Sequence, residues 1–431
     1  MLDTMLRQTR TDKKTNKVVN YAYDVINRLT KADDRATTAV ELPVASAVPA
    51  GFPVMAPSTA APRIIVLLSG YRGDVRLLIL GGTLFLGRHL VEAALDRGDE
   101  VMLFNRGETN ADLYPELEHV RGDRDGDLSA LAGREWDAVV DTSARLPRWV
   151  RTAAEALSDA IAHYTFVSSG SVYADTRAAG VDESAPVHTI ADETTEEITS
   201  PESYGALKAL CERAAEELVP GRVLSVRAGL IVGPYDPTGR FTYWPHRIAR
   251  GGDVLAPEPR DQPVQFVHGR DLADWILSMA ERRVTGVFNA VGPEQPLTLA
   301  SVLDECRRVT RSDAELVWAD ERFLVDEGIE PWSELPLWLA PNVNPAYAGF
   351  LAIDGSQAIA AGLRFRPLAQ TISDTLADAE PTGDAGLSPG READLLAKLR
   401  GRAAAAGERH AFSSSSSTAR RKRTRAARAS Q

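Results

Sequence analysis

Cysteine is scarce in this chain of 431 residues: it occurs twice, as Cys211 and Cys306. Two cysteines cannot build a disulfide framework, and no cysteine or histidine cluster has the spacing of zinc ligands, so we predict no metal site. The first residues, MLDTMLRQTRTDKK, are polar and charged and do not have the pattern of a secretory signal. Together these absences favour a reducing, cytoplasmic location.

Long apolar runs and a uniform positive charge are also lacking. The longest apolar candidate, residues 64–68, is far shorter than the roughly 20 residues that cross a bilayer, so we expect no membrane partner. The formal net charge is −11, but residues 398–431 hold ten basic residues and one acidic residue, so this tail carries +9 and the rest −20. Because an acidic body repels nucleic acid, we expect nucleic-acid contacts only through the basic tail.

Composition divides the chain into four parts. Residues 37–62 are rich in Ala, Pro, Thr and Val without helical or strand periodicity, so we assign residues 1–74 to a poorly ordered extension and linker. Residues 379–431 contain five consecutive serines and the cluster ARRKRTRAAR, which predicts a disordered basic tail with one short helix at residues 392–399. The folded part is therefore expected between these two segments.

From residue 75 to residue 378, short apolar runs alternate with longer helical patterns, which is typical of an α/β protein with a parallel sheet. We assign residues 75–235 to a Rossmann-type, doubly wound, dinucleotide-binding domain, and residues 236–378 to a smaller substrate lobe with returning Rossmann elements. Strands are predicted at residues 75–80, 100–104, 137–141, 163–168 and 222–227. Helices are predicted at residues 87–97, 147–162 and 204–218. The segments at 253–257 and 286–292 are more irregular.

A glycine-rich turn follows the first predicted strand in VRLLILGGTLFLGRHL. Gly81 and Gly82 allow a tight turn, and Gly87 allows the following helix to pack closely on the strand. The amides at the start of that helix can then face a pyrophosphate. A strand, a glycine turn and a helix in this order predict dinucleotide binding.

This turn, together with VVDTSA, FVSSGSVYAD and YGALK in the same order, resembles the extended short-chain dehydrogenase/reductase superfamily, and most of all its NAD-dependent epimerase/dehydratase branch. The resemblance covers residues 75–378. It departs at Leu84, where the fingerprint usually has its central glycine. An atypical subgroup with GGTxFxG shares this departure and includes chloroplast stem-loop-binding proteins.

The resemblance implies an NAD(P) cofactor. The cofactor contacts that it implies in the glycine turn are Gly81, Gly82, Thr83, Leu84, Phe85, Leu86 and Gly87. Past the second strand, Asn105 and Arg106 take the position where an acid would select NAD, and an arginine there favours NADP. Asp123 resembles the adenine-contacting aspartate of the superfamily, although a turn aspartate is equally expected there.

Tyr204 and Lys208 stand four residues apart in YGALK, so on a helix they lie on the same face, one turn apart. A phenol with a reference pKa of about 10 needs neighbouring positive charge to work near neutral pH, and the ammonium and the oxidised nicotinamide are expected to supply it. The resemblance implies that Tyr204 exchanges the proton and that Lys208 also holds the nicotinamide ribose.

The serine strand supplies the third group. Aligning VYA with the VYG of the superfamily places the catalytic hydroxyl on Ser169, where it would hydrogen-bond the substrate oxygen; the alternative is a strand-end serine that caps local backbone. Dehydratases of this superfamily carry an Asp-Glu pair directly after this residue, and here those positions are Gly170 and Ser171. We therefore expect hydride transfer at an oxygen-bearing carbon, in oxidation, reduction or epimerisation, rather than dehydration.

The substrate side is left open between two interpretations. Arg247 and Arg250 are placed to meet an anionic small-molecule substrate such as a sugar nucleotide, and Trp244 to stack on a base or sugar, but Trp244 and Ile248 have the spacing of a core face. Asp271 is expected to be structural. The resemblance also implies a homodimer through helices that flank the sheet.

Two further alternatives concern the chain as a whole. The acidic loop between residues 174 and 203 is either a lid or a solvated insertion. The rival function is a non-catalytic nucleotide- or RNA-binding protein on the same fold, which Leu84 and the basic tail favour and the intact YGALK disfavours.

Overall fold

The computed structural model describes residues 75–126, 128–378 and 385–402. Our expectations for residues 1–74 and for the tail beyond residue 402 lie outside the described residues. Within them, a seven-stranded sheet has the order β11-β6-β5-β4-β1-β2-β3, and every neighbouring pair in it is parallel. Its strands are β1 (Arg76–Leu80), β2 (Glu100–Asn105), β3 (Glu118–Arg121), β4 (Ala138–Asp141), β5 (Tyr164–Ser169), β6 (Val223–Ala228) and β11 (Gly286–Ala290).

The strand order reverses between β1 and β4, which makes the sheet doubly wound and confirms the predicted fold class. Ligands of such sheets bind at the carboxyl ends of the strands beside this reversal. The strands that we predicted from apolar runs all belong to the sheet or to the lobe described below, with ends that differ by a few residues.

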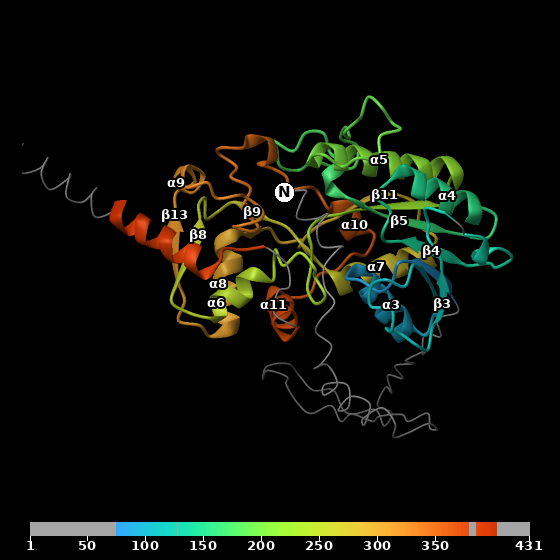
Figure 1. Cartoon of the computed structure of the whole chain (residues 1–431), viewed down its shortest axis with the longest axis horizontal. Helices are drawn as coiled ribbons and strands as arrows, with labels where there is room; N and C mark the ends of the chain where they lie inside the picture. Colours follow the sequence, from blue (N-terminus) through green and yellow to red (C-terminus); the bar gives the residue numbers. More distant parts are fainter. Residues whose placement is uncertain (1–74, 127, 379–384, 403–431) are drawn as a thin grey trace, which may run out of the picture. The chain divides into compact units, whose positions relative to one another are not determined.

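Helices cover both faces of the sheet, as Figure 1 shows. In β1, Leu77 and Ile79 pack against α3 and α7, whereas Leu78 and Leu80 face the layer of α4 and α5. A strand that is buried on both faces reads as a continuous apolar run, which is why RLLIL shows no polar alternation. The helices around the sheet are α3 (Leu86–Arg97), α4 (Pro147–Leu157), α5 (Pro201–Leu218), α7 (Gly269–Glu281) and α10 (Ser356–Ala360).

A smaller lobe follows β6 and has its own apolar core around the fully buried side chains of Trp244 and Trp338. The chain returns from this lobe to the sheet through α7 and β11, so GVFNAVG completes the main sheet. The lobe contains the parallel pair β8 (Asp253–Pro257) and β13 (Glu315–Ala319) and the antiparallel pair β9 (Pro263–Val264) and β12 (Leu297–Thr298). Its helices are α6 (Tyr243–Ala249), α8 (Leu299–Thr310), α9 (Glu321–Asp326) and α11 (Leu368–Ala377).

Several short elements connect these parts: the parallel pair β7 (Ile231–Val232) and β10 (Val267–His268), and the 3-10 turns η1 (Ser129–Leu131), η2 (Gly170–Val172) and η3 (Pro345–Tyr347).

Residues 389–402 are helical, and this differs from our expectation of a disordered tail with a short helix. Leu395 and Leu396 are buried in the core of the lobe, and Glu392 accepts hydrogen bonds from Arg247 and from the backbone of Leu255. Burial of the two leucines and this ion pair hold a segment that its composition alone did not distinguish from the basic tail.

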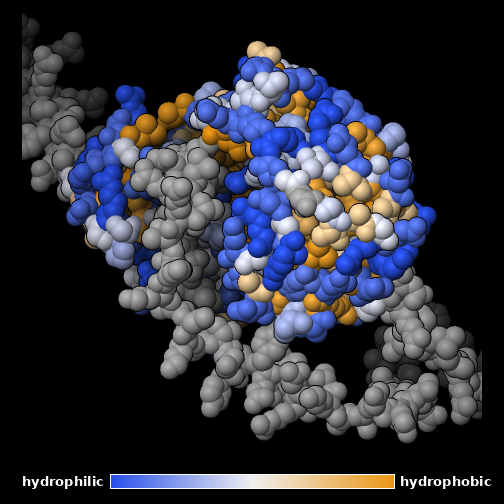
Figure 2. Space-filling view, turned by 45° about the vertical axis from the view of Figure 1, so that its right-hand side comes forward, coloured by the Kyte–Doolittle hydropathy of each residue, from blue (hydrophilic) through white to orange (hydrophobic). Residues whose placement is uncertain are grey.

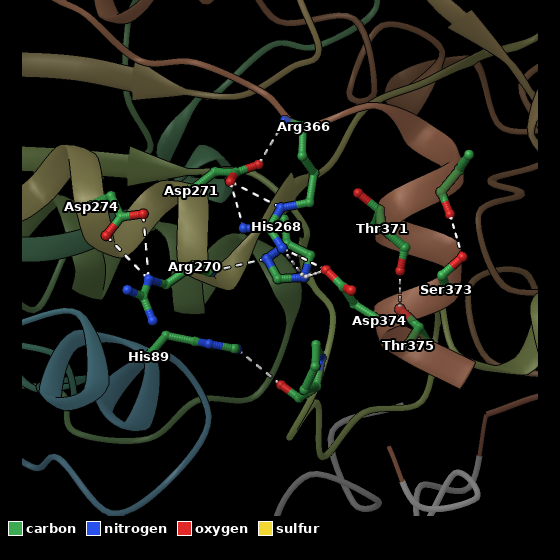
Figure 3. Close-up of polar contacts among 12 residues, drawn as sticks. His89, His268, Arg270, Asp271, Asp274, Arg366, Thr371, Ser373, Asp374 and Thr375 are labelled. Atoms are coloured by element: carbon green, nitrogen blue, oxygen red, sulfur yellow. Dashed lines mark hydrogen bonds and ion pairs between the residues drawn. The ribbon is translucent and has the colours of Figure 1, made fainter. Parts of the chain in front are cut away.

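A polar network joins α3, α7 and α11 (Figure 3). Arg366 ion-pairs with Asp271 near the start of α7 at 2.8 Å and with Asp374 of α11 at 2.5 Å. His268 caps α7 by accepting from its backbone, and the ring of His89 on α3 lies 5.7 Å from the ring of His268. Asp271 is therefore structural, as expected.

Figure 2 shows hydrophilic side chains over most of one face of the described residues, with smaller hydrophobic areas between them. Among the described residues, three large apolar side chains are exposed: Leu84, Val325 and Val343. No helix in this part of the chain is long and apolar enough to cross a membrane.

Candidate functional site

The glycine turn connects β1 to α3 at the strand-order reversal. Gly81 and Gly82 have φ angles of 121° and 95°, which L side chains rarely adopt. A Cβ on Gly82 would lie 2.7 Å from a methyl carbon of Leu103, and a Cβ on Gly87 would lie 2.8 Å from the backbone of Gly82. Gly81 and Gly82 are therefore required by their backbone angles, and Gly87 by the close approach of α3 to the turn.

The four residues between Gly82 and Gly87 differ in their burial. Thr83 and Leu86 are buried, Phe85 is half-buried and has a φ of 39° at the start of α3, and Leu84 is 52 % exposed. Leu84 thus points away from the core at the position that the fingerprint usually leaves to glycine. The Leu84 side chain therefore takes no part in the packing between β1 and α3.

Two asparagine side chains donate hydrogen bonds to backbone carbonyls of the glycine turn. Asn105 at the end of β2 donates from Nδ2 to the carbonyl of Gly81 at 3.1 Å, and Asn110 donates from Nδ2 to the carbonyl of Thr83 at 2.9 Å. Asn105, which we had assigned to the cofactor, thus orients the turn itself. Asn110 has no motif around it, and only its contact in space identifies it.

Arg106 and Asp123 lie at the carboxyl ends of β2 and β3, on the edge of the sheet that holds the glycine turn. The Arg106 side chain is 58 % exposed and lies 3.1 Å from the carboxylate of Glu108. Asp123 is exposed and accepts from the backbone of Asp125 at 3.0 Å. Both are near the turn, but neither contacts it directly in the described hydrogen bonds.

The three serines after β5 have different environments. Ser168 is buried and donates to Glu212 at 2.5 Å, so its hydroxyl is committed to the interior. Ser169 is only half-buried; its Oγ accepts from the backbone of Ser171 at 3.1 Å and donates to the Ser171 hydroxyl at 3.2 Å. The side chain of Ser169 also lies close enough to the Tyr204 phenol to lower its pKa. The structure therefore brings Ser169 and Tyr204 together.

Helix α5 holds Tyr204 and Lys208 close to the serine turn. It begins with a capping box formed by Ser200 and Ser203. Gly205 follows the tyrosine directly, and a Cβ there would collide with the carbonyl of Ser171. The glycine in YGALK therefore allows the helix to approach the turn, which the motif spacing alone did not reveal.

Lys208 is buried, and its Nζ donates to the carbonyls of Val167 at 2.7 Å and Ala144 at 2.9 Å. Burial lowers the pKa of Lys208 to about 8. These two bonds leave one of the three ammonium hydrogens for another acceptor. Lys208 also ties the ends of β4 and β5 together at the strand-order reversal.

The charge around Tyr204 differs from our expectation. Burial raises the pKa of the Tyr204 phenol above its usual value, and the neighbouring Ser169 side chain and the positive charge of Arg145 act in the opposite direction. Arg145 follows Ala144, whose carbonyl binds Lys208. Sequence reasoning missed Arg145, because no motif pairs it with a tyrosine 59 residues away.

Two buried ion pairs lie at the end of β4 and on α5, close to Lys208 in the chain or in the fold, and we predicted neither from the sequence. Asp141 at the end of β4 is fully buried and accepts two hydrogen bonds from Arg124, at 2.5 and 2.8 Å. Burial alone would raise the pKa of Asp141, but Arg124 reverses this effect and holds the pKa below its usual value. Glu212, one turn after Lys208, pairs with Arg227 of β6 at 2.8 Å.

Two of the side chains that were open between a substrate role and the core are structural. The Trp244 ring is fully buried and donates from Nε1 to the carbonyl of Pro336 at 2.8 Å. Arg247 pairs with Glu392 at 2.6 Å. Arg250 is exposed. Cys211 is a core side chain, and its burial raises the pKa of the thiol to about 12.

A dinucleotide fits the residues that are present. The glycine turn lies at the carboxyl end of β1 beside the start of α3, and Lys208 has a hydrogen available for a ribose hydroxyl. In the described part of the chain, no group of three His, Cys, Asp or Glu side chains is arranged to hold a metal ion.

Residues 77–291 match the NAD dependent epimerase/dehydratase family. Among solved structures, the fold is similar to that of UDP-N-acetylglucosamine 4-epimerase from Bacillus cereus, at 16 % identity and a TM-score of 0.53, covering 72 % of this chain and 100 % of that chain. It is also similar to two Bordetella bronchiseptica enzymes. WbmH, solved with NAD+, has 16 % identity, a TM-score of 0.52 and coverage of 70 % and 97 %. WbmG, solved with NAD and UDP, has 18 % identity, a TM-score of 0.52 and coverage of 72 % and 97 %.

A curated relative is the chloroplast stem-loop binding protein of 41 kDa b from Arabidopsis thaliana, which is 27 % identical over 260 residues. The match covers 54 % of this chain and 63 % of the relative, so it spans less than two thirds of that protein. The family match includes the glycine turn, Ser169 and the Tyr204–Lys208 pair. Residues 77–291 of the chain belong to the NAD dependent epimerase/dehydratase family.

Proposed function

We propose that this protein is an NAD(P)-dependent oxidoreductase or epimerase that transfers hydride at an oxygen-bearing carbon of a sugar nucleotide or a small carbonyl compound. One observation carries the proposal: the side chain of Ser169 lies beside the Tyr204 phenol at the end of β5, with Lys208 one turn further along α5. A protein that only binds nucleotides has no need of this set.

The cofactor would be held by the glycine turn and by Lys208. When bound, the nicotinamide supplies or accepts the hydride. The amides at the start of α3 would meet the pyrophosphate, and the remaining hydrogen of Lys208 would bind the ribose. Arg106 supports a preference for NADP, because β2 ends at Asn105 without an acid and the exposed guanidinium can reach a 2′-phosphate.

The proton chemistry would belong to Tyr204 and Ser169. With its pKa raised by burial, Tyr204 is protonated at neutral pH and can donate its proton to a carbonyl oxygen. Ser169 would hold that oxygen by a second hydrogen bond, and in the reverse direction the same two groups would remove the proton of an alcohol. Gly170 and Ser171 offer no further acid or base, so elimination of water is not expected.

A second candidate function is non-catalytic binding of RNA or a nucleotide. The 27 % identity to a protein named for stem-loop binding favours it, and so does the exposed Leu84 in the glycine turn. The acidic body of the chain and the Ser169–Tyr204 contact favour the enzyme.

The substitution Tyr204→Phe tests the enzyme proposal. We expect oxidation or reduction of the cofactor with a panel of sugar nucleotides and carbonyl compounds to fall by at least about 100-fold, because the proton donor is lost. Affinity for NADPH should stay the same. Tyr114→Phe, which removes a hydroxyl bonded to Glu92 outside the serine turn, is the control.

Two results would contradict the proposal. In one, Tyr204→Phe keeps its rate or loses cofactor binding. In the other, the wild-type protein turns over no member of the panel and binds an RNA stem-loop, which would establish the second candidate function.

A further inference from the structure

Arg145 stands on the connection between β4 and α4, at residues 142–146. Its side chain is exposed, and its guanidinium lies 6.0 Å from the ring centre of Trp149 in α4. Within the residues that the structure describes, no carboxylate lies at ion-pair distance from this guanidinium. Three other arginines at the same edge of the sheet have such partners: Arg106 with Glu108, Arg124 with Asp141 and Arg148 with Glu196. The charge of Arg145 is therefore available to a bound anion.

The backbone just before Arg145 is held from two sides. The carboxylate of Asp141 accepts from the amides of Ser143 and Ala144, at 3.2 Å each. The carbonyl of Ala144 accepts from Nζ of Lys208 at 2.9 Å. Because this backbone is fixed before any ligand arrives, only the side chain of Arg145 loses freedom on binding, which lowers the entropic cost of holding an anion there.

The exposed charge also lies beside the proposed proton donor. Lys208, which binds the carbonyl just before Arg145, is one turn along α5 from Tyr204. The positive charge of Arg145 acts on the Tyr204 phenol, and the Ser169 side chain lies beside the same phenol. An anion held by Arg145 would therefore be close to the carbon whose oxygen Tyr204 and Ser169 are proposed to bind.

We propose that Arg145 binds a carboxylate that the substrate carries on or beside its oxygen-bearing carbon. The planar fork of a guanidinium matches the two oxygens of a carboxylate. Two classes of compound have this chemistry: 2-oxo or 2-hydroxy acids, and nucleotide sugars whose sugar is a uronic acid. This inference rests on the proposed function and specifies its substrate.

The carboxylate would orient the substrate as well as hold it. With the carboxylate on Arg145 and the oxygen between Tyr204 and Ser169, the reacting carbon is fixed from two sides, which favours a productive geometry. A neutral compound of the same shape would have only the contacts to Tyr204 and Ser169. The site should therefore discriminate between substrates by charge.

Calorimetric titration of the full chain with two matched pairs of compounds tests the site and separates the two classes. 2-Oxobutyrate is compared with 2-butanone, which has a methyl group in place of the carboxylate, and UDP-glucuronate with UDP-glucose, which has a hydroxymethyl group there. Each pair is titrated into the complex with the cofactor form that cannot react with it, NADP+ for the ketones and NADPH for the sugar nucleotides. We expect the wild type to bind the charged member of one pair at least about tenfold more tightly than the neutral member.

Substitutions of Arg145 should act on the charged compound alone. Arg145→Met should remove the preference and leave binding of the neutral member unchanged, and Arg145→Lys should keep part of the preference, because it retains the charge but not the planar fork. Arg148→Met is the matched control, since Arg148 is also exposed beside this connection but is held by Glu196. A merely structural role of Arg145 predicts that both members of a pair bind equally less well to Arg145→Met.

The inference is overturned if the wild type prefers the charged member of neither pair, or if Arg145→Met keeps the preference. Weaker binding of NADPH by Arg145→Met would also overturn it, since the arginine would then belong to the cofactor site. NADPH titrated into the wild type keeps the two proposals apart. Binding of NADPH without a preference for either charged compound contradicts the Arg145 site alone, and failure of the wild type to bind NADPH contradicts the proposed function.

Discussion

The roles of the charged residues around Tyr204 differ from those that the YGALK spacing suggests. Lys208 directs its ammonium to the carbonyls of Ala144 and Val167, whereas the positive charge that lowers the Tyr204 pKa belongs to Arg145. The lysine thus ties the ends of β4 and β5 together and uses two of its three hydrogens in doing so. The arginine, next to the carbonyl that the lysine binds, lowers the pKa of the phenol against the larger effect of burial, which raises it.

Arg145→Ala should therefore raise the pKa of Tyr204 further. Removing a nearby positive charge favours the neutral phenol, so the inflection of kcat/KM that belongs to Tyr204 should move to higher pH, by up to about one unit. Arg148→Ala is the control, since Arg148 pairs with Glu196 and does not act on the phenol. An unchanged pH profile in Arg145→Ala would contradict this assignment.

Among the elements, α5 is tied to β6 by the buried pair of Glu212 and Arg227, whose side chains are 10 % and 7 % exposed. Glu212 also accepts from Ser168 of β5, next to Ser169. Glu212 therefore links the helix that carries Tyr204 to both β5 and β6.

Glu212→Gln should lower the free energy of unfolding by roughly 3–5 kcal/mol, because it leaves the Arg227 charge buried without its partner. Urea unfolding followed by circular dichroism measures this change. Glu217→Gln on the same helix removes an exposed partner of Arg151 and Arg213 and should change the free energy of unfolding little. If both substitutions lowered the free energy of unfolding equally, the buried pair would contribute no more to stability than the exposed pair does.

Some of these elements and contacts could be predicted from the sequence, and others could not. Apolar runs predict the strands, because a strand buried on both faces has no polar position, and short motifs predict the glycine turn and the Tyr204–Lys208 pair. Asn110, Arg145 and Glu392 have their partners far away in the chain, so no local pattern marks them. The alignment of VYA predicted Ser169 among the three serines, and the structure adds that Ser168 is buried.

At the scale of the whole molecule, the junction of α3, α7 and α11 makes stability depend on pH (Figure 3). Burial is the main cause that lowers the pKa of His89 from 6.5 to about 4 and that of His268 to about 3, and the positive charges of Arg270 and Arg366 act in the same direction. The unfolded chain then binds more protons than the folded protein below pH 6.5. Stability is complete above that pH and is lost as the pH falls toward 4.

His89→Gln should make the thermal midpoint less sensitive to acid. The amide can still donate to the carbonyl of Pro234, which accepts from His89 at 3.0 Å, but it does not titrate. Between about pH 7 and about pH 5, the midpoint of the variant should fall less than that of the wild type. His188→Gln, outside the junction, should behave as the wild type, and an equal fall in His89→Gln would contradict the role of the junction.

The account of the whole molecule depends on the cofactor turn in which Leu84 replaces the usual glycine. Calorimetric titration of the wild-type chain with NADPH and NADH tests it most directly. In the proposed function the turn and Lys208 would hold the dinucleotide and Arg106 would meet a 2′-phosphate, so we expect both to bind and NADPH to bind more tightly. Binding of neither cofactor would contradict the account, since Leu84 would then close the site.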